Sequence, residues 1–521
     1  MRRSLVIVAL AISLAVSGQA VSTNDTVKVE GGLISGTVAD GVRTFKGIPF
    51  AAPPVGELRW KAPQAVVPWQ GVRQSDAFGP ECPQAPYPAG SMYASPPQRQ
   101  SEDCLYLNVW TAAKTGQKLP VMVWIHGGAL TRGSGANRTY NGAAFARKGV
   151  VLVTINYRLG PLGYLAHPEL TNESPQHSSG NYGVLDQIAA LKWVQKNIAA
   201  FGGDARNVTI FGESAGSWSV NALVATPLAK GLFHRAIGES GGSFGPMSYL
   251  KEDKARLTAA EKVGVAFAKA AGADSIKALR AVPAEKIIDV FNNDTEGKKF
   301  RTSPNVDGWV LPDEIRNIFV QGKQNDVPVI VGSNANEMST LTVPAMVPKT
   351  IEDYRKRIEP LYGEATRDFD ALYPVKSDSD VASAYLGSLR DVTFTLPMRT
   401  WARMTATGRS KAYLYFFSRV PPNPNSSYLG AYHAAEIAYV FNNLNPQNTM
   451  LQEVDRKLAE TMTTYWVNFA KTGDPNGKGL PRWTPYNEKD EPYMDFGDVV
   501  QVRQHLLKSQ LDFLEQFQRR R

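Results

Sequence analysis

The chain has 521 residues, of which 43% are hydrophobic and 20% charged, a balance typical of a globular protein with a large buried core. Its formal net charge is +9, but Lys and Arg are scattered among acidic residues without long runs of like charge, so we expect no nucleic-acid partner. A basic surface can also favour an anionic substrate, which is a weak indication by itself.

The first twenty residues have the layout of a secretory signal peptide. Arginines at positions 2 and 3 precede an apolar run (5–16), and small residues follow up to Ala20. The alternative is a membrane anchor, but a run of about twelve apolar residues is short of the roughly 20 that span a bilayer. We therefore expect export to the periplasm or the cell exterior, a mature chain beginning near Val21, and no stable membrane span.

Two cysteines, Cys82 and Cys104, flank a Pro-rich stretch. In an exported protein, two cysteines this close in sequence are expected to form one disulfide, and a pair of free buried thiols is the alternative. A metal site is not expected, because two cysteines without a nearby histidine offer too few ligands.

Strand-like and helix-like patterns alternate along the first half of the chain. Short apolar runs at 120–125, 150–157 and 207–211 are rich in β-branched residues and predict buried strands. Apolar residues spaced by three and four within 181–204 predict a helix that ends at two glycines. Further strands are predicted at 234–240 and 327–334. The alternation indicates an α/β fold with a mostly parallel sheet covered on both faces.

Two further segments, 251–300 and 345–410, have mainly helical patterns. They contain no strand-like run of the same quality. We expect them to form cap or packing helices outside the sheet.

The pattern G-x-S-x-G occurs twice, around Ser214 and around Ser240. In one large class of hydrolases this pattern forms a sharp turn between a buried strand and a helix, and the turn exposes a nucleophilic serine. Ser214 follows the strand-like VTIF and precedes a long helix-forming run. Ser240 also follows a strand but opens into GGSFGPMSY, which predicts a loop. The context therefore favours Ser214 as the nucleophile.

A nucleophilic serine needs a base, usually a histidine held by a carboxylate. In α/β-hydrolases the chain order is serine, acid, histidine. Of the six histidines, His433 is the one that leaves room for a strand and an acid after Ser214. Glu337, just past the strand at 327–334, is the preferred acid. The competitor, Asp307, precedes a glycine in a sequence typical of a turn.

A Gly-rich loop, WIHGGAL at 124–130, follows the first predicted buried strand. It resembles the loop whose backbone N–H groups hold the oxyanion in esterases. Gly128 and Ala129 would present two N–H groups, and Ala215 a third. A phosphate cradle is the alternative, but the Gly-Lys-Ser/Thr of a P-loop is absent.

Motifs along nearly the whole mature chain are similar to those of the type-B carboxylesterases, a cholinesterase-like family with the α/β-hydrolase fold. The matching stretches are FKGIPFAAPPVGELRW (45–60), SEDCLYLNVW (101–110), PVMVWIHGGA (120–129), NYRLGPLGYL (156–165), NYGVLDQIAALKWVQKNIAAFGGD (181–204), VTIFGESAGS (208–217), GSNANE (332–337) and AYHAAEIAYVF (431–441).

The resemblance implies a triad of Ser214, Glu337 and His433. It also implies an oxyanion hole at Gly128, Ala129 and Ala215, with Ala129 in place of the commoner third glycine, and a disulfide between Cys82 and Cys104. Ser240 would lie near the catalytic site and support the histidine by hydrogen bonding. Length alone suggests about three domains, but the resemblance implies one catalytic domain over residues 21–521.

The expected reaction is hydrolysis of a small-molecule carboxylic ester through an acyl-enzyme, without a metal or an organic cofactor. The loop type hints at esters with sizeable alcohol groups. Hydrolysis of an amide, carbamate or lactone on the same fold is an alternative, and a non-catalytic binding protein is another. The sequence carries no signal for a particular oligomeric state.

Overall fold

The computed structural model describes residues 26–520, except 89, 95, 97, 115, 255, 294–299 and 301–302. The predicted signal peptide lies outside the described residues. Within the described ranges, every helix is too short or too polar to span a bilayer.

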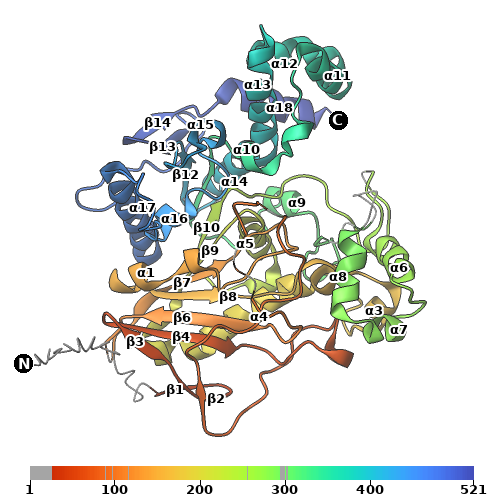
Figure 1. The fold of residues 1–521 in the computed structure, drawn as a ribbon, viewed down its shortest axis with the longest axis vertical. Coiled ribbons are helices and arrows are strands. Elements are labelled where there is room, and N and C mark those ends of the chain that lie inside the picture. Colours follow the sequence, from red (N-terminus) through yellow and green to blue (C-terminus); the bar gives the residue numbers. More distant parts are fainter. Residues whose placement is uncertain are drawn as a thin grey trace, which may run out of the picture.

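The described residues build an 11-stranded sheet in the order β14-β13-β12-β11-β10-β9-β7-β8-β6-β4-β3, with a separate small sheet of β1, β2 and β5 (Figure 1). The pairs from β8 through β7 to β13 are parallel, and the pairs at both edges are antiparallel. The strands are β1 Thr26–Val29, β2 Gly32–Ser35, β3 Thr37–Ala39, β4 Val42–Pro49, β5 Val72–Gln74, β6 Tyr106–Thr111, β7 Leu119–Ile125, β8 Val151–Ile155, β9 Gly203–Glu213, β10 Arg235–Glu239, β11 Val329–Asn334, β12 Ala412–Phe417, β13 Pro492–Phe496 and β14 Val500–Gln504.

The predicted buried strands correspond to β7 to β11, so the mostly parallel α/β sheet is confirmed. The predicted helix within 181–204 is also present. It ends in a 3₁₀ turn at Gly202, whose φ of 80° is the left-handed conformation that glycine adopts without strain.

Helices cover both faces of the sheet (Figure 1). They are α1 Ala143–Arg147, α2 Gly160–Tyr164, α3 Pro168–Glu173, α4 Tyr182–Asn197, α5 Ala215–Ala225, α6 Ala260–Ala270, α7 Ile276–Ala281, α8 Ala284–Asn292, α9 Ile315–Val320, α10 Met338–Leu341, α11 Ile351–Tyr362, α12 Thr366–Leu372, α13 Asp378–Arg390, α14 Leu396–Ala406, α15 Ser426–Leu429, α16 Ile437–Val440, α17 Glu453–Thr472 and α18 Lys508–Arg519.

The central strands are buried on both faces because their side chains alternate between two cores. In β7, Val121, Val123 and Ile125 join the core under α4, α5 and α14. Met122 and Trp124 join the opposite core, which α1, α16 and α17 cover. This packing explains why the sequence of β7 is a continuous apolar run.

The two segments with helical patterns lie outside the sheet, as predicted. One forms α6 to α8 beside α3, and the other forms α11 to α13 near the C-terminal helix α18 (Figure 1). The second segment has a small core of its own, which includes Tyr354, Phe369 and Tyr373.

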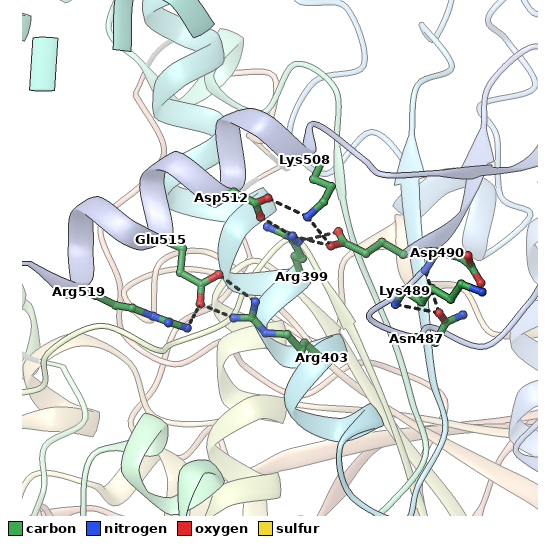
Figure 2. A network of polar contacts seen from close by, with 10 residues as sticks. Arg399, Arg403, Asn487, Lys489, Asp490, Lys508, Asp512, Glu515 and Arg519 are labelled. Carbon is green, nitrogen blue, oxygen red and sulfur yellow. Dashed lines mark hydrogen bonds and ion pairs between the residues drawn. The ribbon is translucent and has the colours of Figure 1, made fainter. Parts of the chain in front are cut away.

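The C-terminal helix α18 is tied to α14 by buried and half-buried ion pairs (Figure 2). Arg399 on α14 binds Glu491 through two hydrogen bonds of 2.9 and 2.7 Å and contacts Asp512 on α18 at 2.6 Å. Arg403, one turn along, pairs with Glu515. Paired guanidinium–carboxylate contacts of this geometry are strong and directional. They hold α18 against α14, which packs on β11 and β12.

Candidate active site

Ser214 is the single residue between the end of β9 at Glu213 and the start of α5 at Ala215. Its φ of 56° and ψ of −122° are values that L residues rarely adopt. Glycine is required on both sides, because a Cβ at Gly212 or Gly216 would lie 2.5 or 2.0 Å from the same carbonyl oxygen of the neighbouring strand β7. The predicted strand-turn-helix around the serine is therefore present.

Ser240 occupies the equivalent position on the adjacent strand. β9 and β10 are parallel, and Glu213 at the end of β9 pairs with Glu239 at the end of β10. The two serines, each the next residue, therefore occupy matching positions, and Ser240 has a φ of 53°. A loop follows Ser240, as predicted, and its Gly241 packs against the carbonyl oxygen of Ser214. The two similar motifs thus lie side by side at one edge of the sheet.

The predicted hydrogen bond from Ser240 to the histidine is not formed. Ser240 Oγ is buried and has no hydrogen-bond partner in the described part of the chain. The physical reason is that both ring nitrogens of His433 already face carboxylates, Nδ1 at Glu337 and Nε2 at Glu213.

The structure brings His433 and Glu337 together in a buried contact of 2.6 Å between Nδ1 and Oε2. Glu337 lies just past β11, and its Oε1 accepts the backbone N–H of Asn334 at 2.7 Å. His433 lies in the loop before α16, and this loop is joined to the Glu337 loop by a bridge between Asn336 and Tyr432. The arrangement orients the imidazole and stabilises a positive charge on it.

Asp307, the competing acid, performs the turn role that its sequence indicates. Its carboxylate accepts hydrogen bonds from the backbone N–H groups of Trp309 and Leu311, each at 3.0 Å, and from Ser178 Oγ at 2.5 Å. These contacts hold Asp307 in its own turn and join it to the loop that carries Ser178.

Glu213 faces the other side of the imidazole, which the sequence reasoning missed. Its Oε1 lies 3.1 Å from His433 Nε2, the atom that would take a proton from Ser214 in the predicted triad. Glu213 therefore occupies the side of the ring where Ser214 Oγ would bind. Ser214, the next residue in the chain, makes no hydrogen bond with His433 among the described residues. The imidazole thus lies between two buried carboxylates, hydrogen-bonded to Glu337 and in close contact with Glu213, whose Oε1 has no hydrogen-bond partner among the described residues.

Burial and mutual repulsion raise the pKa values of the carboxyls around this imidazole. Burial raises the pKa of Glu213 to about 7, and the charge of His433 opposes this rise. Burial likewise raises the pKa of Glu239 to about 8 and that of Glu436 well above its ordinary value. Burial alone would lower the pKa of His433, but the charges of Glu213 and Glu337 raise it to about 9.

The backbone N–H groups of Gly128, Ala129 and Ala215 make no hydrogen bond with any residue that the structure describes. Gly128 and Ala129 have φ values of 104° and 56°, which turn the loop after β7 sharply. Ala215 is the first residue of α5, where the helix dipole places partial positive charge. Unpaired donors of this kind can bind an oxyanion.

A surface cleft of about 1030 Å³ lies elsewhere, lined by residues that include Arg43, Lys114, Lys118 and Arg206. It is at the ends where β7 and β9 begin, and it contains none of the predicted site residues. Ligands of open α/β sheets bind at the opposite, carboxyl ends of the strands. The cleft is therefore not the candidate active site.

A family model described as the carboxylesterase family matches residues 23–514. The chain belongs to the carboxylesterase family. It is 38% identical over 486 residues to the fumonisin B1 esterase of Sphingopyxis macrogoltabida, covering 90% of this chain and 86% of that protein. It is 36% identical over 475 residues to the para-nitrobenzyl esterase of Bacillus subtilis (strain 168), covering 90% of this chain and 94% of that protein.

The structure of this carboxylesterase is also similar to solved ones. A structure of PNB esterase, 34% identical in sequence, superimposes with a TM-score of 0.80 over 94% of this chain and 99% of that chain. The predicted α/β-hydrolase fold is therefore confirmed, and the protein is a carboxylic-ester hydrolase by family.

The disulfide between Cys82 and Cys104 is present in this carboxylesterase, and the loop that it closes is bound to the candidate site. The side-chain amide of Gln84 exchanges two hydrogen bonds with the backbone of Gly133, at 2.7 and 3.0 Å. The hydroxyl of Tyr93 donates to the backbone carbonyl of His433 at 2.9 Å. The loop therefore contacts both the oxyanion loop and the histidine.

Three residues near His433 carried no usable sequence signal. Glu213 lies inside the serine motif, where its side chain has no motif role, and Tyr93 lies in an irregular loop. Phe394, whose ring centroid is 4.9 Å from that of His433, lies in a π-helical turn, Asp391–Thr395. Such turns are frequent at functional sites, but a helical sequence pattern does not reveal them.

Replacing Glu213 by glutamine is expected to move the pH profile of the carboxylesterase to lower pH. Only the neutral imidazole can act as a base, so kcat/KM should rise with pH through the His433 pKa of about 9. Removing the Glu213 charge destabilises the imidazolium, lowers this pKa and shifts the rise by about one pH unit. Glu285→Gln, the same change on exposed α8, is the control, and an unshifted profile in Glu213→Gln would contradict the prediction.

Replacing both Cys82 and Cys104 by alanine is expected to lower the free energy of unfolding by about 3 kcal/mol, because the unfolded chain gains the freedom of the opened loop. Urea unfolding of the wild type and the double variant measures the difference. Equal stability would show that the loop contacts, and not the covalent link, hold this region.

Proposed function

We propose that the protein is an exported carboxylic-ester hydrolase that works through an acyl-enzyme on Ser214. His433 is the general base and Glu337 the acid that orients it. The observation that supports this most is the buried 2.6 Å contact between His433 Nδ1 and Glu337 Oε2, beside a strand-turn-helix that carries a serine. The three residues follow the chain order of an α/β-hydrolase triad.

In the first half-reaction, Ser214 Oγ attacks the ester carbonyl carbon and His433 Nε2 takes the hydroxyl proton. This step requires Nε2 to turn from Glu213 to Ser214 Oγ. The C–O bond to the alcohol then breaks, and the imidazolium returns its proton to the leaving alkoxide. In the second half-reaction, His433 deprotonates a water molecule, whose oxygen attacks the acyl carbon. The bond from this carbon to Ser214 Oγ then breaks, the imidazolium returns its proton to Ser214 Oγ, and the carboxylic acid is released.

The oxyanion of each tetrahedral intermediate would be held by the N–H groups of Gly128, Ala129 and Ala215. Each such donor contributes roughly 3 kcal/mol in comparable sites. Ala129 can replace glycine here, because only its backbone N–H is needed and its φ of 56°, though unfavourable, is held by the surrounding turn.

The substrates that we propose are esters with a sizeable acyl or alcohol group. The names of two relatives, fumonisin B1 esterase and para-nitrobenzyl esterase, specify esters of this kind for those proteins. Removal of residues 1–20 during export is part of the proposal, and N-terminal sequencing of secreted or periplasmic protein would test it.

Labelling with an organophosphate, followed by peptide mapping, tests the proposed nucleophile. The label is expected on the peptide that contains Ser214, and loss of ester turnover should follow labelling stoichiometrically. Matched ester and amide substrates then define the bond that is cleaved. Label on Ser240, or faster cleavage of the amide than of the ester, would overturn the proposal.

A further inference from the structure

Arg132 lies next to the proposed oxyanion loop without an acidic partner. Its backbone N–H donates to the carbonyl of Gly128 at 3.0 Å, so the turn that ends this loop places Arg132 beside it. Its Nε donates to the carbonyl of Ala85 at 3.1 Å. Among the residues that the structure describes, no carboxylate forms an ion pair with its half-buried guanidinium.

A row of aromatic side chains connects Arg132 with His433. The guanidinium carbon lies 5.7 Å from the ring centroid of Tyr87, and the Tyr87 and Tyr93 rings are 6.2 Å apart. The Tyr93 hydroxyl reaches the carbonyl of His433. Burial raises the pKa of Tyr87, while Arg132 lowers it and Glu213 raises it, so both charges act on the same phenol. The guanidinium therefore belongs to the surroundings of the proposed active site.

We propose that Arg132 binds a carboxylate group of the substrate, so that the preferred esters carry a free carboxylate, as monoesters of dicarboxylic acids do. The inference rests on the proposed function, because it concerns the substrate of that same site. With Nε committed to Ala85, the two terminal nitrogens remain for a planar, bidentate contact with a carboxylate. A lysine would offer the charge without this geometry.

Burial weakens the negative charge of several carboxyls around His433. Burial raises the pKa of Glu239 to about 8 and that of Glu436 well above its ordinary value, which disfavours the charged form of both carboxyls. Arg132 itself forms no ion pair with a carboxylate in the described part of the chain, although the charges of Glu81 and Glu213 also act on the neighbouring Tyr87.

The test compares two matched substrates, the 4-nitrophenyl monoester of glutaric acid and 4-nitrophenyl pentanoate, which differ in one terminal carboxylate. In the wild type, glutarate should inhibit hydrolysis of the neutral ester competitively. In Arg132→Gln, the ratio of kcat/KM for the anionic over the neutral ester should fall about tenfold or more, mainly through KM, as expected for a lost charged hydrogen bond. Arg132→Lys should recover part of the ratio.

Arg147→Gln, on the exposed surface of α1, removes the same charge away from the site and should leave the ratio unchanged. If Arg132→Gln lowers turnover of both esters equally, Arg132 only supports the loop and the inference is wrong. The inference is also wrong if Arg132→Gln leaves the ratio of kcat/KM for the two esters unchanged and glutarate does not inhibit the wild type. A wild type that hydrolyses neither ester would contradict the proposed function itself.

Discussion

Replacing Ser214 by alanine is expected to abolish ester hydrolysis, with kcat falling on the order of 10⁶-fold, the loss typical of removing a catalytic serine. The fold should persist, because alanine keeps the Cβ and Ser214 Oγ makes no hydrogen bond with a described residue that the change would break. Turnover of a 4-nitrophenyl ester measures the activity, and circular dichroism with thermal unfolding measures the fold.

Ser240→Ala is the matched control for this experiment. Ser240 has the same motif, the same strand register and nearly the same φ, but it opens into a loop. We expect at most a partial reduction in turnover, because Ser240 Oγ has no hydrogen-bond partner in the described part of the chain. If Ser240→Ala were inactive and Ser214→Ala kept normal turnover, the assignment of the nucleophile would be wrong.

Replacing Glu337 by glutamine is expected to lower kcat by about 10⁴-fold, as the loss of the orienting acid does in serine hydrolases. Glu337 accepts two hydrogen bonds, from His433 Nδ1 and from the backbone N–H of Asn334. The amide of glutamine can accept only one of them with its oxygen. If the amide oxygen accepts from Nδ1, the NH₂ group faces the backbone N–H of Asn334, and two donors meet. If the NH₂ group instead donates to Nδ1, the ring proton lies on Nε2, and Nε2 cannot take the proton of Ser214.

Asp307→Asn separates the two candidate acids. Asp307 is bound within its own turn, so this variant should keep near-normal kcat and lose at most some stability. Single-turnover kinetics of both variants, with the unfolding midpoint measured in parallel, distinguishes loss of chemistry from loss of fold. A larger drop in kcat for Asp307→Asn than for Glu337→Gln would reverse the assignment of the acid.

Much of the fold was predictable because it depends on local patterns. β7 and β8 are buried on both faces, so their sequences are nearly continuous apolar runs. Ser214 could be distinguished from Ser240 because a helix-forming run follows Ser214, whereas a loop-forming run follows Ser240. Glu337 was predictable because residues just past parallel strands gather at one edge of the sheet.

The remaining features of the site depend on contacts between distant segments, which no local pattern encodes. Tyr93 reaches a carbonyl 340 positions away. Glu213, the last residue of β9, meets His433 in the loop before α16 only because these distant segments pack together. The family resemblance suggested a bond from Ser240 to the histidine, but the carboxylates at both ring nitrogens leave no place for it.

The amino-acid sequence by itself determined the α/β architecture, the turn that carries Ser214 and the identity of the candidate base and acid. Each of these depends on periodicity, chain order or a short motif. Only the tertiary structure decided the charge environment of His433, the position of Arg132 beside the oxyanion loop and the unpaired state of Ser240 Oγ. These properties depend on burial and on which polar groups meet, and both arise only when segments distant in sequence pack together.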